Sequence, residues 1–278
     1  MKKIDLSIVI LNFNTKNLTL NCMESVVKYG ANVDCEIIVV DNGSDEHFPE
    51  GKYKLIQNGT NLGFAGGNNS ARTAVNGEYV LFLNSDTLVH EDTLQKSLSY
   101  IKADEKIGAL SVKTLLPNGS FDPDARRSFP TPWVSLTHLS GLDRLFPKSK
   151  LFAKYWYGFR SGELVQEVDV IQGAFFLTRK DLLDKVDWFS EDYFLDGEDI
   201  DLCWKIKDEG YEIIYYPDTF ITHLKKATKR KFKDISVGRG VDSMEIFYRK
   251  YLWNKYPFVL NLMVLAGIRL IKLVRLLK

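Results

Sequence analysis

Tyr79-Val-Leu-Phe-Leu-Asn-Ser-Asp86 is the stretch that decides the fold, because an apolar run typical of a buried strand passes directly into polar residues. A second run of the same design, Glu36-Ile-Ile-Val-Val-Asp41, also ends in an aspartate. In open sheets built from alternating strands and helices, ligands bind at the carboxyl ends of the strands. The two strand-end carboxylates therefore predict a ligand site at one edge of a largely parallel sheet.

Strand and helix signals alternate outward from this stretch. Such alternation predicts an α/β fold with a mixed, mostly parallel central sheet flanked by helices. Residues 117–147 lose the pattern and are rich in proline, which predicts an irregular insertion along one side of a cleft. The expected strands are 6–11, 36–40, 54–57, 79–83, 108–112, 174–178 and 211–216, and the expected helices are 18–29, 66–75, 92–101 and 200–208.

The composition is typical of a globular protein, except that the C-terminal segment is strongly basic. The chain's 278 residues, 45% of them hydrophobic, suffice for one large α/β domain with or without an extension. The net charge of +1 conceals an asymmetry, because residues 225–278 hold 14 Lys and Arg residues and 3 Asp and Glu residues. A strongly basic segment on an acidic body predicts contact with an anionic surface, either membrane or nucleic acid.

The basic segment ends in a pattern typical of an interfacial helix. Residues 244–278 are predicted to be helical with a break near Pro257, and the last part carries four cations at a spacing of three, Arg269, Lys272, Arg275 and Lys278. Such a basic amphipathic helix suits the interface of an anionic membrane. The alternative is a helix that packs on the body or on a second copy, as in a homodimer.

The expected location follows from the apolar runs. No run reaches the roughly 18 residues of a membrane span. We therefore expect a cytoplasmic protein, peripheral on the inner face of the cell membrane.

Two strand-end motifs allow a functional and a structural interpretation. Asp86 is suited to hold Mg²⁺ or Mn²⁺, which prefer carboxylate and phosphate oxygens, yet Asn84-Ser-Asp86 is also a common turn sequence. Asp41 is suited to accept hydrogen bonds from a ribose or a base, but Asp41-Asn-Gly-Ser44 also reads as a tight turn. Neither motif by itself distinguishes the functional interpretation from the structural one.

Three further features carry the same ambiguity. The glycines and asparagines of residues 58–69 are able to bring backbone close to an anionic ligand, or form a plain flexible loop. Glu198 and Asp199 begin an expected helix, where acids act either as a general base or as helix-capping charges. His223 follows a strand, and a lone histidine is more often structural than a ligand.

Taken in order along residues 4–224, six pieces resemble the family 2 glycosyltransferases of the GT-A fold. The branch that they resemble most comprises the rhamnosyltransferase-like enzymes of bacterial cell-wall, capsule and O-antigen assembly. The pieces are Ser7-Ile-Val-Ile-Leu-Asn-Phe-Asn14, Val40-Asp-Asn-Gly-Ser44, Asn61-Leu-Gly-Phe-Ala-Gly-Gly-Asn-Asn69, Leu83-Asn-Ser-Asp86, Gly173-Ala-Phe-Phe-Leu-Thr-Arg179 and Gly197-Glu-Asp-Ile-Asp-Leu-Cys-Trp204.

The resemblance implies a division of the chain and a nucleotide-sugar site. Residues 1–224 would form the GT-A catalytic domain, with a nucleotide-binding half, 1–115, and an acceptor half, 116–224. Residues 225–278 would be a basic loop and an amphipathic helical tail. The residues implied at the nucleotide-sugar site are Asn12, Asn14, Asp41, Asn61, Gly63, Gly66, Asn68, Asn84, Ser85 and Gly173.

The resemblance also implies catalytic and metal-binding roles. Asp86 would be the metal-binding aspartate of a DXD-like motif that holds Mn²⁺ or Mg²⁺. Asn84 stands where a strict motif has its first aspartate, so His223 gains importance as a second ligand. Asp199 would be the general base and Glu198 its support. Candidate contacts to an acceptor or a phosphate are Arg126, Arg127, Lys225 and Lys226.

The implied reaction is an inverting, metal-dependent sugar transfer. A sugar, with rhamnose favoured, would move from a dTDP- or UDP-sugar to a hydroxyl of a lipid-linked or polysaccharide glycan acceptor. UDP-galactose, UDP-glucose, UDP-N-acetylglucosamine and UDP-galactofuranose remain open as donors.

Two rival functions explain less of the sequence. A nucleotidyltransferase usually has a Gly-rich basic loop after its first strand, where this chain has Asn12-Phe-Asn-Thr15. A non-catalytic module that binds membrane or nucleic acid would leave the ordered acidic motifs of the body unexplained. We therefore expect no nucleic-acid partner.

Overall fold

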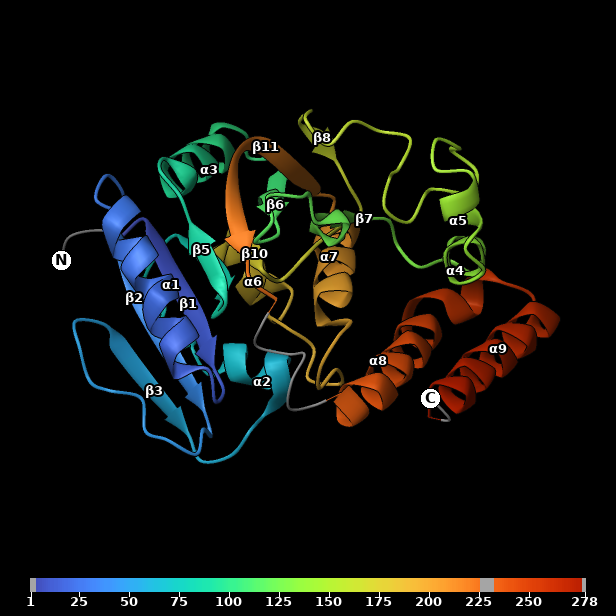
Figure 1. Cartoon of the computed structure of the whole chain (residues 1–278), viewed down its shortest axis with the longest axis horizontal. Helices are drawn as coiled ribbons and strands as arrows, with labels where there is room; N and C mark the ends of the chain where they lie inside the picture. The colour runs from blue at the N-terminus through green and yellow to red at the C-terminus, as the bar shows by residue number, and fades with distance from the viewer. Residues whose placement is uncertain (1–3, 226–232, 277–278) are drawn as a thin grey trace.

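A computed structural model describes residues 4–225 and 233–276 of the chain (Figure 1), and the statements below concern these ranges. Nine strands form one sheet in the order β3-β2-β1-β4-β10-β6-β11-β5, with β8 paired to β11. A separate two-stranded sheet joins β7, Arg126–Arg127, to β9, Val170–Ile171. The strands of the large sheet are β1 Leu6–Asn12, β2 Cys35–Asn42, β3 Lys54–Asn58, β4 Tyr79–Asn84, β5 Thr87–Val89, β6 Ile107–Leu115, β8 Gln166–Glu167, β10 Phe175–Arg179 and β11 Glu212–His223.

The strand directions confirm the expected fold class. Strands β1, β2, β3, β4, β6 and β11 run in one direction, whereas β5, β8 and β10 run against it. The antiparallel β10 lies between β4 and β6 and separates the two parallel parts. The sheet is therefore mixed and mostly parallel.

Strand β4 explains why its sequence is a continuous apolar run. Successive side chains of a strand point to opposite faces, so a strand covered on both faces has no polar alternation. Val80 and Phe82 face one apolar core, and Leu81 and Leu83 face the other. The ring of Phe82 packs edge-on against Phe189 at a centroid distance of 4.7 Å. This double burial makes β4 the centre of the fold.

The helices cover both faces of the sheet. Buried residues of α1 and α3 belong to one core, and those of α2, α6 and α7 belong to the other. The helices are α1 Lys16–Tyr29, α2 Gly63–Asn69, α3 Thr93–Ala103, α4 Pro132–Leu139, α5 Leu142–Leu145, α6 Lys180–Lys185, α7 Glu198–Asp208, α8 Lys233–Phe247 and α9 Phe258–Leu276. Short 3₁₀ segments lie at Pro123–Ala125 and Trp253–Lys255, and a π-helical turn lies at Tyr248–Leu252.

Three expected elements differ from the structure. The helix predicted over 66–75 is α2, which starts three residues earlier and ends at Asn69. The predicted strand 211–216 continues as β11 to His223, across a register shift between Tyr216 and Phe220. The insertion at 117–147 is not wholly irregular, because Pro132 occupies the first position of α4, where its missing N–H costs nothing.

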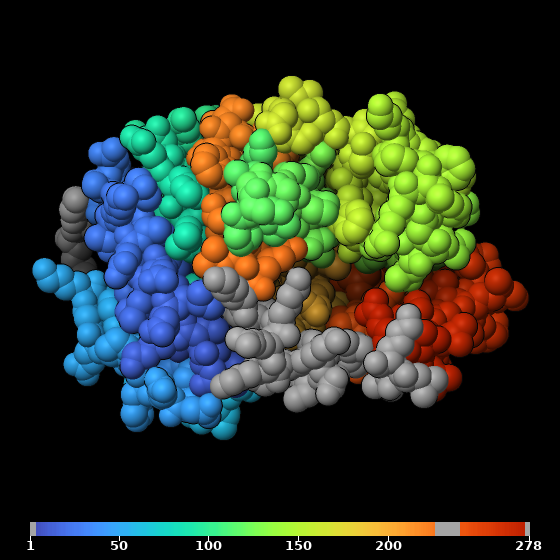
Figure 2. Space-filling view, in the orientation of Figure 1, coloured from blue at the N-terminus to red at the C-terminus, as the bar shows by residue number. Residues whose placement is uncertain are grey.

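The C-terminal tail packs on the body of the protein. Val241, Phe247, Leu252 and Leu265 form an apolar cluster with Tyr193, which lies just before α7. Buried Asp201 of α7 accepts hydrogen bonds from tail residues, at 2.9 Å from Lys250 Nζ and 2.8 Å from Tyr251 Oη. Figure 2 shows the tail adjoining the α4–α5 insertion on one side of the molecule.

The outer face of α9 differs from the predicted basic stripe. Of the four predicted cations, Arg269 is exposed, Arg275 lines a cavity, Lys272 pairs with Asp242 of α8, and Lys278 lies outside the described residues. The face that α9 presents to the outside is mainly apolar. No helix in the described ranges is both long enough and apolar enough to cross a bilayer. The exposed large apolar side chains of α9 are Phe258, Val259, Leu262, Met263, Leu270, Leu273 and Val274.

The two faces of α9 provide a matched test of tail packing. Leu265 is 7% exposed and Leu262 is 49% exposed on the same helix. We expect Leu265→Ala to lower the stability of the tail by about 2–4 kcal/mol through lost burial, and Leu262→Ala to change it by less than about 0.5 kcal/mol. Hydrogen exchange of the α9 amides measures both values. Equal protection in the two variants would contradict the packing described here.

Candidate active site

The register of the parallel strands brings the predicted polar residues to one edge of the sheet. Asn12 is aligned with Asp41 on β2, and its neighbour Leu11 is aligned with Asn84 on β4. Asn12 Nδ2 donates to Asp41 Oδ1 at 2.9 Å and to Ser44 Oγ at 3.0 Å. The carboxyl ends of three strands thus meet, as the sequence predicted.

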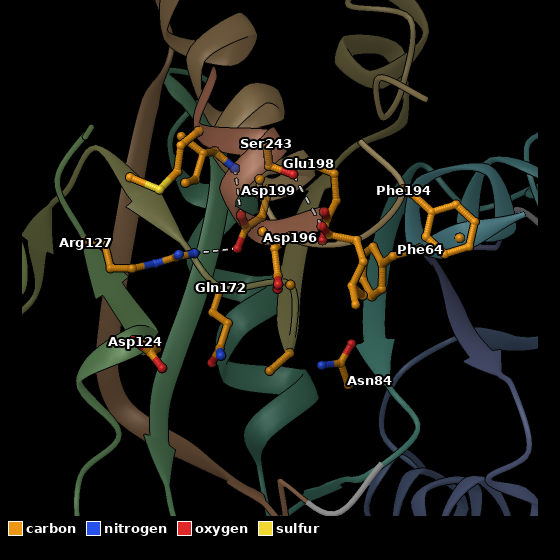
Figure 3. A pocket seen from close by; sticks show the side chains of 18 of the residues that line it. Phe64, Asn84, Asp124, Arg127, Gln172, Phe194, Asp196, Glu198, Asp199 and Ser243 are labelled. Atoms are coloured by element: carbon orange, nitrogen blue, oxygen red, sulfur yellow. Dashed lines mark hydrogen bonds and ion pairs between the residues drawn. The ribbon is translucent and has the colours of Figure 1, made fainter. Parts of the chain in front are cut away.

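A cavity of about 760 Å³ opens beside this edge. One wall comes from the ends of β1, β2 and β4 and from the start of α2, and includes Phe13, Asn61, Phe64 and Asn84. The opposite wall comes from the insertion and from the tail. In Figure 3, Asn84 and Phe64 lie on one side and Arg127 and Asp124 on the other, with Asp196 and Glu198 between them.

Asn42 organises the loop on the first wall, although the sequence did not single it out. Its amide donates to Asn61 Oδ1 at 3.0 Å and to the Gly63 carbonyl at 2.9 Å, and its oxygen accepts from the Leu62 N–H at 3.1 Å. Gly63 has φ +77, and a Cβ there would stand 2.4 Å from the Phe194 carbonyl oxygen. A glycine is therefore required at this close approach. The sequence feature that could have identified Asn42 is its position directly after the strand-end residue Asp41.

The expected nucleotide-sugar residues divide into two groups. Among the described residues, five line the cavity and five do not. Asn14, with φ 55, accepts a hydrogen bond from the Asp45 N–H and so holds a loop in place, whereas Asn68 donates to the Phe64 carbonyl within α2. The lining residues are Asn61, Gly63, Asn84, Ser85 and Gly173. The expected residues that do not line the cavity are Asn12, Asn14, Asp41, Gly66 and Asn68.

Asp86 and His223 lie side by side at the base of the cavity. His223 Nε2 stands 3.1 Å from Asp86 Oδ1, and its Nδ1 stands 3.8 Å from Asp122 Oδ2. Burial disfavours the charged ring, but the nearby carboxylates of Asp122 and Asp86 favour it and raise the pKa of His223 to about 9. The end of β11 thus brings together two residues that lie 137 positions apart in the sequence.

Asp86 and His223 together offer two ligands to a divalent cation. Within residues 4–225 and 233–276, no group of three or more His, Cys, Asp or Glu side chains is arranged to hold a metal ion. Two ligands on adjacent corners of an octahedral Mg²⁺ or Mn²⁺ site lie about 3 Å apart, because each bond is about 2.1 Å long. The 3.1 Å between Asp86 and His223 fits such a pair, with the other positions left to phosphate oxygens and water.

The first turn of α7 supplies the acidic centre of the cavity. Gly197 caps the helix with φ +100, and Glu198 and Asp199 follow it on the wall. Asp199 forms an ion pair with Arg127, drawn as a dashed line in Figure 3, and its Oδ1 accepts from the Ile200 N–H at 2.8 Å. Asp199 therefore meets the cavity as one member of an ion pair and not as an isolated carboxylate.

Glu198 is a buried acid in an unfavourable environment. The residue is 7% exposed, and in the described part of the chain its Oε2 has no hydrogen-bond partner. Burial, followed by the charges of Asp199 and Asp196, raises the pKa of Glu198 well above its ordinary value. The side chain therefore resists ionisation, which makes it a source of pH-dependent stability.

The four basic residues that were expected to contact an acceptor or a phosphate differ in where their side chains lie. Arg126 turns away from the cavity and donates to Gln166 Oε1 at 2.7 Å and to the Arg160 carbonyl at 2.9 Å. Arg127 reaches the cavity but is engaged by Asp199, and Lys225 lies 2.9 Å from Asp122 and 3.1 Å from Asp124. Lys226 lies outside the described residues. Arg126 is therefore not placed to contact a ligand in this cavity.

Sequence reasoning missed the contribution of the tail to the cavity. Ser243 and Phe247 of α8 and Arg275 of α9 line it together with α7. Gln172, just before Gly173, also lines it, and within the described ranges its buried Oε1 has no partner. Of these residues, only Gln172 could have been found from the sequence, because it directly precedes Gly173, which the family resemblance had already selected.

Comparison with known proteins agrees with this geometry. The model of the family described as glycosyl transferase family 2 matches residues 7–187. A poly-beta-1,6-N-acetyl-D-glucosamine synthase of Staphylococcus aureus is 26% identical over 190 residues, which make up 66% of this chain and 41% of the synthase. The chain thus spans about two fifths of the length of that relative.

Solved structures share the fold. The mannosyltransferase PcManGT of Pyrobaculum calidifontis, in complex with GDP-Man and Mn²⁺, has a TM-score of 0.60 and 17% identity, over 90% of this chain and 65% of that protein. S. aureus TarS in complex with UDP has a TM-score of 0.55 and 18% identity, over 87% of this chain and 65% of that structure. These likenesses confirm the expected GT-A fold.

The raised pKa of Glu198 can be tested through the pH dependence of the protein's stability. Its folded pKa is raised, so its contribution to stability is present below its unfolded pKa, about 4.3, and is lost as the pH rises through the folded value. Gln cannot ionise. We expect Glu198→Gln to gain stability relative to wild type as the pH rises from 5 to 8, by about 1.4 kcal/mol per unit of pKa shift.

Denaturant unfolding at several pH values measures this difference. The matched control is Glu46→Gln, because Glu46 is 81% exposed and should show no such trend. A stability difference between Glu198→Gln and wild type that stays constant with pH would contradict the raised pKa.

Proposed function

Because the chain belongs to glycosyl transferase family 2 and is therefore a glycosyltransferase, we propose that it transfers a sugar from a UDP- or dTDP-sugar with inversion at the anomeric carbon. The observation that carries this proposal is the convergence of three groups in one cavity. The strand-end residues Asn84 and Asp86, the histidine His223 and the acids that begin α7 all face the same space. Such an arrangement suits a nucleotide diphosphate on one side and an attacking hydroxyl on the other.

Two donor sugars compete within this proposal. The resemblance of the motifs favours rhamnose, whereas the S. aureus relative is named as a synthase of an N-acetylglucosamine polymer. UDP accompanies TarS and GDP-Man accompanies the mannosyltransferase, so related folds accept different nucleotides. The residues that would meet the base lie around Phe13 and Asn42 at the cavity wall.

Asp86 and His223 would hold a divalent cation. Their 3.1 Å separation supports this role, and Asp122 behind His223 would orient the ring, as carboxylates commonly do for metal-bound histidines. When bound, Mn²⁺ or Mg²⁺ would stabilise the charge of the leaving diphosphate. Mn²⁺ is present in the mannosyltransferase structure, which supports the same choice here.

Asp199 would accept the proton of the attacking hydroxyl. Each carboxylate oxygen has two lone pairs, so Asp199 retains acceptor capacity while it binds Arg127 and the Ile200 N–H. Arg127 would keep the acid oriented toward the cavity. A single displacement by the acceptor oxygen inverts the anomeric carbon without a covalent intermediate, so a second nucleophilic carboxylate is not needed.

The acceptor would be a lipid-linked or polysaccharide glycan, reached at a membrane surface. The exposed apolar face of α9, including Met263 and Leu270, supports shallow insertion into the headgroup region. The excess of Lys and Arg in residues 225–278 supports attraction to anionic lipids. We place the protein on the inner face of the cell membrane, with the tail as its contact.

A panel of UDP- and dTDP-sugars with Mn²⁺ or Mg²⁺ tests the function, scored by transfer of the sugar to an acceptor and by release of nucleoside diphosphate. We expect one donor to be used, and Asp199→Asn to slow transfer by about 10²–10⁴-fold because the general base is lost. Calorimetry of UDP with the same variant should show binding close to that of wild type.

The control for this experiment is Asp192→Asn, since Asp192 is 65% exposed and precedes α7 by only a few residues. Equal transfer by Asp199→Asn and wild type would remove Asp199 from the role of base. If no donor of the panel is bound or turned over, the proposed function fails as a whole.

Co-sedimentation with vesicles tests the membrane contact. We expect the wild-type protein to bind vesicles that contain anionic lipid, and Met263→Gln combined with Leu270→Gln to reduce binding about tenfold or more, because buried apolar area is lost. The control is Val27→Gln on α1, where the side chain is 69% exposed.

The outcomes of the vesicle experiment are distinct. No binding of the wild type to anionic vesicles would exclude the membrane contact. Concentration-dependent association of the wild type that disappears in the α9 variant would instead assign this face to a homodimer.

A further inference from the structure

A histidine–aspartate pair in the insertion plays no part in the mechanism above. His138 Nδ1 of α4 lies 2.6 Å from Asp143 Oδ2 of α5, and Asp143 is only 6% exposed. A carboxylate accepts hydrogen bonds, so the ring hydrogen at this contact belongs to Nδ1. The other ring nitrogen, Nε2, has no hydrogen-bond partner within residues 4–225 and 233–276. The pair therefore fixes one end of the imidazole and leaves the other end for a ligand.

Aromatic contacts fix the plane of the same ring. Tyr155 stacks on His138 at a centroid distance of 4.2 Å and an angle of 27°, and Trp156 meets it edge-on at 4.5 Å. Trp156 is itself held, because its Nε1 donates to Asp124 Oδ1 at 3.1 Å. His138 is thus oriented by contacts within the protein, which lowers the entropy that must be lost on binding a ligand.

This oriented ring faces the cavity beyond the nucleotide side. Ser135, His138 and Leu139 line the cavity from one face of α4, since residues three and four apart on a helix are neighbours. Tyr155 lines it beside them, and Phe247 of α8 lines it from the tail. The subsite therefore combines aromatic and apolar surface with a few polar groups, which is the usual composition of a specific small-molecule site.

The subsite is connected to the proposed base. The Arg127 guanidinium pairs with Asp199, and Tyr155 is another of the groups that raise the pKa of Arg127. Tyr155 in turn stacks on His138. A ligand seated against His138 and Tyr155 would lie next to the arginine that orients Asp199.

We propose that His138, Tyr155 and the cavity face of α4 bind the sugar ring of the acceptor, with His138 Nε2 accepting a hydrogen bond from one of its hydroxyls. This assignment rests on the proposed function and adds the acceptor subsite to it. The ligand class is a neutral hexose or N-acetylhexosamine ring. Its C–H face packs on aromatic surface, and its hydroxyls reach His138 and Ser135. His138 acts as a positioning residue that selects which hydroxyl faces Asp199.

Octyl glycosides of glucose, galactose, rhamnose and N-acetylglucosamine are the probes, tested against the full chain loaded with UDP and Mn²⁺. Saturation-transfer NMR should detect at least one glycoside, with transfer concentrated on the ring protons. His138→Ala and Tyr155→Ala should each weaken that glycoside at least about tenfold, the loss expected for one well-formed polar or aromatic contact. UDP affinity, measured by calorimetry, should change by less than twofold.

The controls separate this subsite from a structural role and from the donor site. His47→Ala removes an exposed histidine from a loop away from the cavity and should leave glycoside binding unchanged. Tyr155→Phe keeps the stacking ring and should retain most of the binding that Tyr155→Ala loses. Thermal unfolding of each variant shows whether the fold survives.

Two results would overturn the assignment. The first is binding of UDP without binding of any glycoside, which would leave the proposed function intact. The second is glycoside binding that His138→Ala leaves unchanged while its unfolding temperature matches wild type. Absence of binding of both UDP and dTDP to the wild type would instead refute the proposed function, and the acceptor subsite with it.

Discussion

The burial of β4 on both faces is the constraint on which the rest of the structure depends. A strand covered on both sides must be apolar along its whole length, and it must end where polar groups are again tolerated. In β4 that end is Asn84, followed by Ser85 and Asp86. Because β1 and β2 run parallel to it, their ends reach the same edge, and loops with polar side chains gather there. The position of the cavity is therefore a consequence of how the core is packed.

Compensated charges are the second feature of the cavity. Asp199 is paired with Arg127, Asp86 with His223, and Asp122 with Lys225. Buried charges are costly without partners, and each of these three acids has a cation beside it that balances its charge. Glu198 is the exception, and its raised pKa is the physical result. A phosphorylated ligand would compete with these acids for the same cations.

The tail is a structural part of the cavity. Its apolar residues form a core with Tyr193, its Lys250 and Tyr251 bind the buried Asp201, and Phe247 and Arg275 line the cavity. Tail packing and membrane contact, which were alternatives in the sequence, are compatible in the structure because α9 has two faces. The inner face is buried against the protein, and the outer face exposes large apolar side chains.

Sequence by itself determined the order of the elements, the α/β class, the polar edge of the sheet and the family resemblance, because all of these depend on local periodicity and on motifs of adjacent residues. It also selected Asp86, Asp199 and His223. Only the tertiary structure decided which of the selected residues share a cavity. It joined His223 to Asp86 across the sheet, tied Arg127 to Asp199, turned Arg126 away, and placed His138 and Phe247 on the cavity wall. These contacts join segments that are distant in the chain, and no local pattern encodes which side chains face one another once the strands and helices have packed.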